Sequence, residues 1–97
     1  MKKAIKIFEK DHVATATSKI NSGESILITG VAGAEMIEAN EEIPMGHKVA
    51  LENILKGETI VKYGEVIGVA TDVIQAGDRV HVHNCWGLKG RRNKENV

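Results

Sequence analysis

The sequence contains very little cysteine and few aromatic side chains, and each shortage excludes a class of protein. Cys85 is the only cysteine, so an intramolecular disulfide and a thiolate-rich zinc site are both excluded. Phe8, Tyr63 and Trp86 make up 3% of the residues, which is too few for a platform that stacks nucleic-acid bases.

The sequence also lacks an excess of one charge and any long apolar run. Thirteen basic residues balance 13 acidic ones, so the surface exerts no long-range attraction for nucleic acid or anionic lipid. No run approaches the roughly 20 apolar residues of a membrane helix, and Met1–Lys6 is charged without the apolar segment of a signal peptide. We therefore expect a cytoplasmic protein with no nucleic-acid and no membrane partner.

The chain of 97 residues, with 42% hydrophobic and 27% charged residues, has the size and composition of one small domain. Such a domain has little interior for a deep pocket, because ligand pockets usually occupy about 300–1,000 Å³. We expect a complete catalytic site to need a partner. The sequence predicts a domain over residues 1–88, followed by a basic C-terminal tail over 89–97.

Alternating and β-branched stretches predict a mostly β fold of short strands with at most one or two short helices. The expected strands cover residues 4–8, 12–17, 25–29, 59–62, 66–74 and 79–83. Residues 33–42 contain helix formers but are equally compatible with a strand, and residues 49–55 have room for one helical turn.

The phrase I-x-x-G-x-x-[IV] occurs four times, with its glycines at Gly23, Gly46, Gly57 and Gly77. Their unequal spacing excludes a solenoid of fixed period. We expect each isoleucine to anchor the end of a segment in the core. Each glycine is expected to adopt a positive φ that turns the chain into the next strand.

Polar side chains of chemical interest occur in three segments, Pro44–Lys48, Lys62–Glu65 and His81–Asn84. An imidazole beside ammonium groups, as at His47, Lys48 and Lys62, suits an anionic substrate such as a carboxylate or sulfonate. Imidazole also exchanges a proton near neutral pH. The alternative is that both lysines are solvated strand residues.

The third segment contains two histidines spaced i, i+2. On a strand this spacing places His81 and His83 on one face, with the adjacent valines facing inward. Two imidazoles supply two nitrogen ligands to a divalent metal, and His47, Glu65 or carboxylates of a partner are candidates for the others. Exposed strand histidines without a ligand are an equally open interpretation.

These segments, in this order, resemble the altronate/galactarate dehydratases, and specifically their small N-terminal SAF domain. Residues 43–51 are similar to the family segment IPxGHKVAL, residues 57–68 to GExVxKYGxxIG, and residues 74–84 to IxxGxxVHVHN. Asp11–Ala14 resembles the early DxVA segment, and Leu88 with Gly90 and Arg91 resembles the LxGR that often follows. The resemblance covers roughly residues 5–91, and the run of three motifs is highly specific.

The resemblance implies a β-clip-like SAF fold and a part in a hydro-lyase that dehydrates a sugar acid of the altronate or galactarate type. Because the sequence stops at Val97, it resembles a separate small subunit, inactive without a large dehydratase-like catalytic subunit. Related alternatives are the small subunit of a sulfolactate sulfo-lyase and a non-catalytic SAF binding module. The family also implies a divalent metal, iron or manganese, and leaves a homo-oligomer open.

The resemblance further implies site residues. Removing a proton α to a carboxylate builds up enolate charge, which a metal ion or cationic groups must stabilise. The implied catalytic residues are His47, His81 and His83, with His81 and His83 also the implied metal ligands. The implied substrate-binding residues are Lys48, Lys62, Tyr63 and Asn84.

Overall fold

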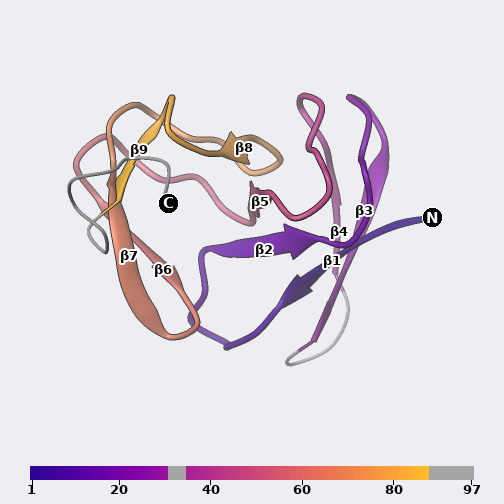
Figure 1. Cartoon of the computed structure of the whole chain (residues 1–97), viewed down its shortest axis with the longest axis horizontal. Coiled ribbons are helices and arrows are strands. Elements are labelled where there is room, and N and C mark those ends of the chain that lie inside the picture. The colour runs from indigo at the N-terminus through magenta and orange to yellow at the C-terminus, as the bar shows by residue number, and fades with distance from the viewer. Residues whose placement is uncertain (31–34, 88–97) are drawn as a thin grey trace.

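The computed structural model of the protein describes residues 1–30 and 35–87, which form nine short strands and no helix (Figure 1). The strands are β1 (Lys2–Lys6), β2 (Val13–Ala16), β3 (Ser25–Gly30), β4 (Glu35–Glu38), β5 (Lys48–Ala50), β6 (Thr59–Lys62), β7 (Glu65–Ala70), β8 (Arg79–Val80) and β9 (Cys85–Gly87). The mostly β prediction is confirmed. The predicted tail over 89–97, with residue 88 before it, lies outside the described residues.

Six strands form one sheet in the order β4-β3-β1-β2-β5-β8, and the other three form a second sheet in the order β6-β7-β9. Among the strand pairs of the described residues, β1–β3 is parallel and the others are antiparallel. In Figure 1, β2 and β5 lie between the small sheet on the left and β1, β3 and β4 on the right. This central pair therefore has a neighbouring layer on both sides.

The central pair separates two hydrophobic clusters because its side chains alternate between its two faces. Ala14 and Val49 pack in one cluster with isoleucines from β3 and the first turns. Val13 and Ala50 pack in the other, with residues of the small sheet. All four are essentially fully buried, so β2 and β5 contribute to the core on both faces.

The four repeated turns have the predicted backbone. Gly23, Gly46, Gly57 and Gly77 have φ between +85° and +96°, a region that other residues adopt at a cost. The isoleucines of the turns then pair with each other in two isolated antiparallel bridges, Ile20 with Ile43 and Ile54 with Ile74.

Each turn glycine also donates its N–H to the carbonyl of an alanine four residues before the partner isoleucine. The bonds run from Gly23 to Ala39, Gly46 to Ala16, Gly57 to Ala70 and Gly77 to Ala50, at 2.8–2.9 Å. The repeated unit is therefore A-x-x-x-I-x-x-G, used as two mutually bonded pairs. The pairing gives the fold two similar halves, on either side of the β2–β5 pair.

Some strand predictions are wrong at their ends. The strand expected over 79–83 ends at Val80, and residues 81–84 form a turn. The strand expected over 66–74 ends at Ala70. Of the two stretches weighed for helix, 33–42 contains strand β4 (Glu35–Glu38), with 33 and 34 outside the described residues, and 49–55 begins with the last two residues of β5 and continues without a helical turn. Within residues 1–30 and 35–87 no helical segment has the length and apolarity needed to cross a membrane.

Candidate functional site

His47 follows the turn glycine Gly46, at the position whose side chain stabilises each of the other three turns by a hydrogen bond. In those turns the residue after glycine is acidic, and its carboxylate accepts the N–H three residues earlier. The bonds are Asn21 N to Glu24 Oε1 at 2.6 Å, Leu55 N to Glu58 Oε1 at 2.7 Å, and Gln75 N to Asp78 Oδ2 at 2.8 Å. In the turn at Gly46 the residue at the donor position is Pro44, which has no N–H. His47 therefore has no turn N–H to accept, and its imidazole is available for another function.

The pairing of β5 with β8 brings His47 to a second imidazole. Lys48 pairs with Val80 and Val49 with Arg79, so one step further along the ladder places His47 opposite His81. Their ring centroids are 4.8 Å apart, with the planes tilted by 39°. We call His47 and His81 the imidazole pair. Arg79 lies on the same face of the ladder, because side chains two residues apart share a face.

The imidazole pair is biased toward its neutral form. Burial, then the Arg79 charge and then the Lys48 charge lower the pKa of His47 below 6.5. Burial, the neighbouring His47 and the charges of Arg79, Lys48 and His83 lower the pKa of His81 in the same direction. The lowered pKa values favour the neutral ring near pH 7, in which one nitrogen accepts a proton and the other donates one.

Lys48 points to the opposite face of the same ladder, toward the small sheet. Its side chain is 8% exposed, and burial followed by the charge of Lys62 lowers its pKa, while Cys85 acts in the opposite direction. Burial raises the pKa of the Cys85 thiol to about 11, so Cys85 is a protonated thiol near neutral pH and not a nucleophile. The predicted residues Lys48 and Lys62 are thus brought close together, between the two sheets.

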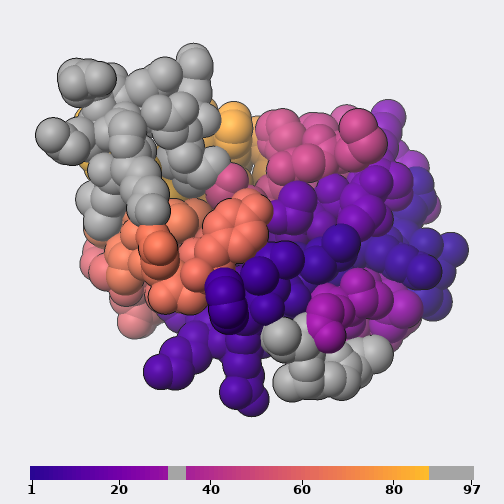
Figure 2. All heavy atoms as spheres, turned by 60° about the horizontal axis from the view of Figure 1, so that its bottom comes forward, coloured from indigo at the N-terminus to yellow at the C-terminus, as the bar shows by residue number. Residues whose placement is uncertain are grey.

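Asp11, which is 1% exposed, stabilises the turn of Lys62 and Tyr63 through hydrogen bonds. The Asp11 carboxylate accepts the N–H groups of Phe8 at 3.0 Å, Tyr63 at 3.1 Å and Gly64 at 2.9 Å. Tyr63 has a positive φ of 58°, and the Lys62 Nζ lies 4.3 Å from the centroid of its ring. Figure 2 shows the β6–β7 hairpin, in orange, against the N-terminal segment, in indigo. Asp11 therefore positions two predicted site residues.

Residues 81–84 do not have the geometry from which the His81–His83 metal pair was predicted. Asn84 closes this turn, since its Oδ1 accepts the His81 N–H at 3.0 Å and its Nδ2 donates to the Arg79 carbonyl at 2.8 Å. Asn84 is buried, His81 is half-buried and His83 is exposed. The one-face argument for the two histidines is therefore wrong, and Asn84 has a structural task besides any contact with substrate.

The donor set of this chain does not fit a metal ion by itself. Residues 1–30 and 35–87 contain no group of three or more His, Cys, Asp or Glu side chains that could hold one. The imidazole pair, moreover, lies near the positive charges of Arg79 and Lys48, which oppose a divalent cation. The arrangement suits an anion better.

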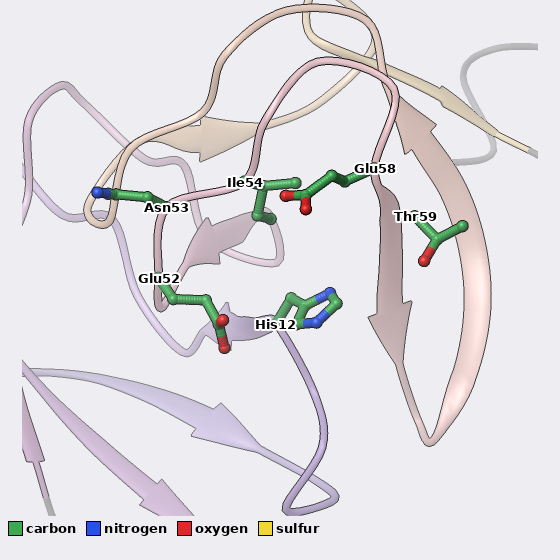
Figure 3. A pocket seen from close by; sticks show the side chains of 6 residues that line it. All are labelled: His12, Glu52, Asn53, Ile54, Glu58 and Thr59. Atoms are coloured by element: carbon green, nitrogen blue, oxygen red, sulfur yellow. The ribbon is translucent and has the colours of Figure 1, made fainter.

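A separate pocket of about 170 Å³ lies beside His12, the residue that precedes β2. Its walls are His12, Glu52, Asn53, Ile54, Glu58 and Thr59. In Figure 3 the side chains of Glu52 and Glu58 point toward the space beside the His12 ring, while Asn53 points away. The His12 Nδ1 accepts the Val61 N–H at 3.1 Å, which fixes the orientation of the ring. None of the predicted site residues lines this pocket.

The sequence analysis missed Arg79, although a signal for it was present. Arg79 and His81 are spaced i, i+2, as are His81 and His83, and only the first pair begins on a strand. Of the predicted residues, the structure brings His47, His81 and Lys48 together around the β5–β8 ladder, with Lys62 reaching Lys48 from the small sheet. Tyr63 contacts Lys62 but is half exposed, and His83 lies at the margin.

Comparison with known proteins agrees with the motifs. Residues 2–87 match the family described as the altronate/galactarate dehydratase SAF domain. The altronate dehydratase of Bacillus subtilis (strain 168) is 43% identical over 84 residues, which are 87% of this chain and 16% of that protein. The galactarate dehydratase (L-threo-forming) of Escherichia coli (strain K12) is 38% identical over 73 residues, 75% of this chain and 13% of that protein.

A shorter relative is the (2R)-sulfolactate sulfo-lyase subunit alpha of Paracoccus pantotrophus. It is 45% identical over 49 residues, which are 50% of this chain and 73% of that subunit. The chain therefore spans a small part of the dehydratases and most of the length of this subunit. Its match to the family over residues 2–87 shows that the chain belongs to the altronate/galactarate dehydratase SAF-domain family.

Proposed function

We propose that this chain is the small SAF-domain subunit of a two-component hydro-lyase that dehydrates a sugar acid of the altronate or galactarate type. A large dehydratase-like subunit completes the catalytic site. The observation that carries the proposal is the convergence of the imidazole pair and Arg79 on one face of the β5–β8 ladder, in a chain homologous to parts of hydro-lyases.

The residues of the ladder match what the elimination of water requires. The acid substrate carries negative charge, and more charge develops on it when the α-proton leaves. The Arg79 guanidinium, on the same face of the ladder as the imidazole pair, stabilises that charge, whereas Lys48 and Lys62 lie on the side of the small sheet. A neutral imidazole with a lowered pKa accepts a proton near pH 7, and the resulting imidazolium can return a proton to the departing hydroxyl.

The divalent metal implied by the family is assigned here to the large subunit. When bound, such an ion polarises substrate oxygens. The described residues of the present chain do not fit it, so we assign them the binding of the acid and the movement of protons. His83, exposed on its turn, is the least supported of the three predicted catalytic histidines.

The test is reconstitution with a large dehydratase-like subunit, followed by measurement of the keto acid formed from altronate and galactarate. Replacing both members of the imidazole pair by glutamine is expected to lower kcat at least about 100-fold, the usual contribution of a positioned acid–base group. His83→Gln tests the third predicted histidine, and Lys56→Gln is the control, since Lys56 is exposed on a different turn. Unchanged turnover in the double variant would indicate a non-catalytic binding module.

A second candidate function is supported by the coverage of the sulfo-lyase subunit, most of whose length aligns with this chain. In a sulfo-lyase, Arg79 and the imidazole pair would bind a substrate that carries both a carboxylate and a sulfonate. Release of sulfite from sulfolactate by the reconstituted pair, without dehydration of sugar acids, would select this function over the first.

A further inference from the structure

Two buried side-chain nitrogens on one face of the β5–β8 ladder have no hydrogen-bond partner among the described residues. His47 Nδ1 and Arg79 Nε are inaccessible to solvent and make no hydrogen bond within the part of the chain that the structure describes. A third unpaired atom, Thr15 Oγ1, lies across from Lys48 on the other face and belongs to no common site with these two. The great majority of buried polar side-chain atoms in proteins are paired, and the Arg79 Nε–H can only donate, so its unpaired state beside an unpaired ring nitrogen points to an acceptor from outside the chain.

Within residues 1–30 and 35–87 the Arg79 guanidinium forms no ion pair with an acidic side chain. Glu41 approaches Arg79, but its Oε2 accepts the main-chain N–H of Arg79 at 3.1 Å and forms no ion pair with the guanidinium. A guanidinium is always charged, so the face retains one positive charge beside two neutral rings.

The sequence explains why the site exists on this turn and not on the other three. There, the residue after glycine is an acidic side chain already bonded to the turn. Here, Pro44 removes the N–H that would need an acceptor, and an imidazole stands in place of the carboxylate. The exchange leaves a ring nitrogen without a partner among the described residues where the other three turns have a bonded carboxylate.

We propose that His47 Nδ1–H and the Arg79 guanidinium jointly bind one carboxylate group of a small hydroxy acid, with His81 beside it. A planar guanidinium matches the two oxygens of a carboxylate, and an N–H from a neutral ring adds a directed bond without adding charge. One fixed positive charge suits a singly charged group. The identity of the acid rests on the proposed function, but the carboxylate site itself belongs to this chain alone.

The test uses the full chain without any partner, labelled with ¹⁵N. Glycolate, the simplest 2-hydroxy acid, is titrated at constant ionic strength against sodium chloride while the Arg79 Nε–H and histidine ring signals are followed by NMR. We expect saturable shifts of the Arg79 and His47 signals with glycolate. Arg79→Lys should weaken binding about tenfold or more, because an ammonium lacks the planar pair of donors.

Matched variants separate a specific site from simple attraction to positive charge. His47→Asn keeps a donor near the Nδ1 position and should retain part of the affinity, whereas His47→Leu should abolish saturable binding. Lys56→Gln removes one exposed positive charge elsewhere and should change nothing. A dispersed two-dimensional spectrum checks that each variant is folded.

The proposal is overturned if the shifts are linear in glycolate, if chloride produces them equally, or if the Asn and Leu variants of His47 bind alike. Its failure is distinct from failure of the proposed function. Saturable carboxylate binding by a chain whose reconstituted complex eliminates neither water nor sulfite would support this site and refute the enzyme assignment. Turnover with no binding by the isolated chain would do the reverse.

Discussion

Replacing Asp11 by alanine should destabilise the domain more than any other single loss of a carboxylate in the described part of the chain. Asp11 is 1% exposed, and its two oxygens accept three main-chain N–H groups at 2.9–3.1 Å. A hydrogen bond to a charged group contributes about 1.5–3 kcal/mol. The three bonds also hold Tyr63 at a positive φ, a conformation that costs about 1 kcal/mol or more outside glycine.

The three contributions do not add fully, because Tyr63 and Gly64 are exposed and water can reach their N–H groups once the carboxylate is gone. We therefore expect Asp11→Ala to lower the free energy of unfolding by about 3–4 kcal/mol, a large part of the about 5–15 kcal/mol of a typical domain. Urea unfolding followed by circular dichroism measures the change.

Asp72→Ala is the matched control, since Asp72 is exposed and its carboxylate accepts one adjacent N–H, that of Val73, at 2.8 Å. Its effect should stay within about 0.5 kcal/mol. Asp11→Asn, which keeps one acceptor oxygen, should fall between the two. A loss below about 1 kcal/mol for Asp11→Ala, or one equal to the control, would show that these contacts do not fasten the β6–β7 hairpin.

Three further outcomes can be measured on the isolated chain. Gly68→Ala should cost about 3 kcal/mol in urea unfolding, because its Cβ would lie 2.5 Å from the Trp86 carbonyl oxygen, whereas Gly23→Ala, with open space but a positive φ, should cost about 1 kcal/mol. Stability should fall as the pH drops below 6.5, because the pKa values of the imidazole pair are lowered in the folded state and the unfolded chain takes up protons first; glutamine at both positions should flatten this dependence. The Cys85 thiol, with its pKa raised to about 11, should react with iodoacetamide at pH 8 only after unfolding, and rapid reaction of the folded chain would contradict its burial.

The local features of the fold were predictable, whereas their pairing was not. A glycine three residues after an isoleucine predicts a positive φ wherever it occurs, and all four turns have it. Nothing in the repeated phrase says that Ile20 meets Ile43 and Ile54 meets Ile74, because the four copies have the same apolar anchor. Partner choice comes from the packing of β2 against β5, which involves residues far apart in sequence.

The site was predictable in composition more than in geometry. His47 and His81 were both singled out, and the ladder brings them together because β5 and β8 are antiparallel. The alternation over residues 79–83 is typical of a strand, but the Asn84 side chain bonds both Arg79 and His81 and closes a turn instead. The i, i+2 spacing was therefore applied to His83, which lies on the turn, and not to Arg79, which lies on the strand before His81.

The exchange of an acidic cap for a proline and a histidine shows how little of each turn depends on the side chain after its glycine. The main-chain bond from that residue back to the turn is kept in all four copies, at 2.9–3.1 Å. Leu55→Pro combined with Glu58→His should therefore retain the backbone, which an unchanged amide spectrum would verify, and would add a second ring to the wall that His12 lines. A domain built this way can acquire new reactive centres by two substitutions at a time, without redesign of its strands.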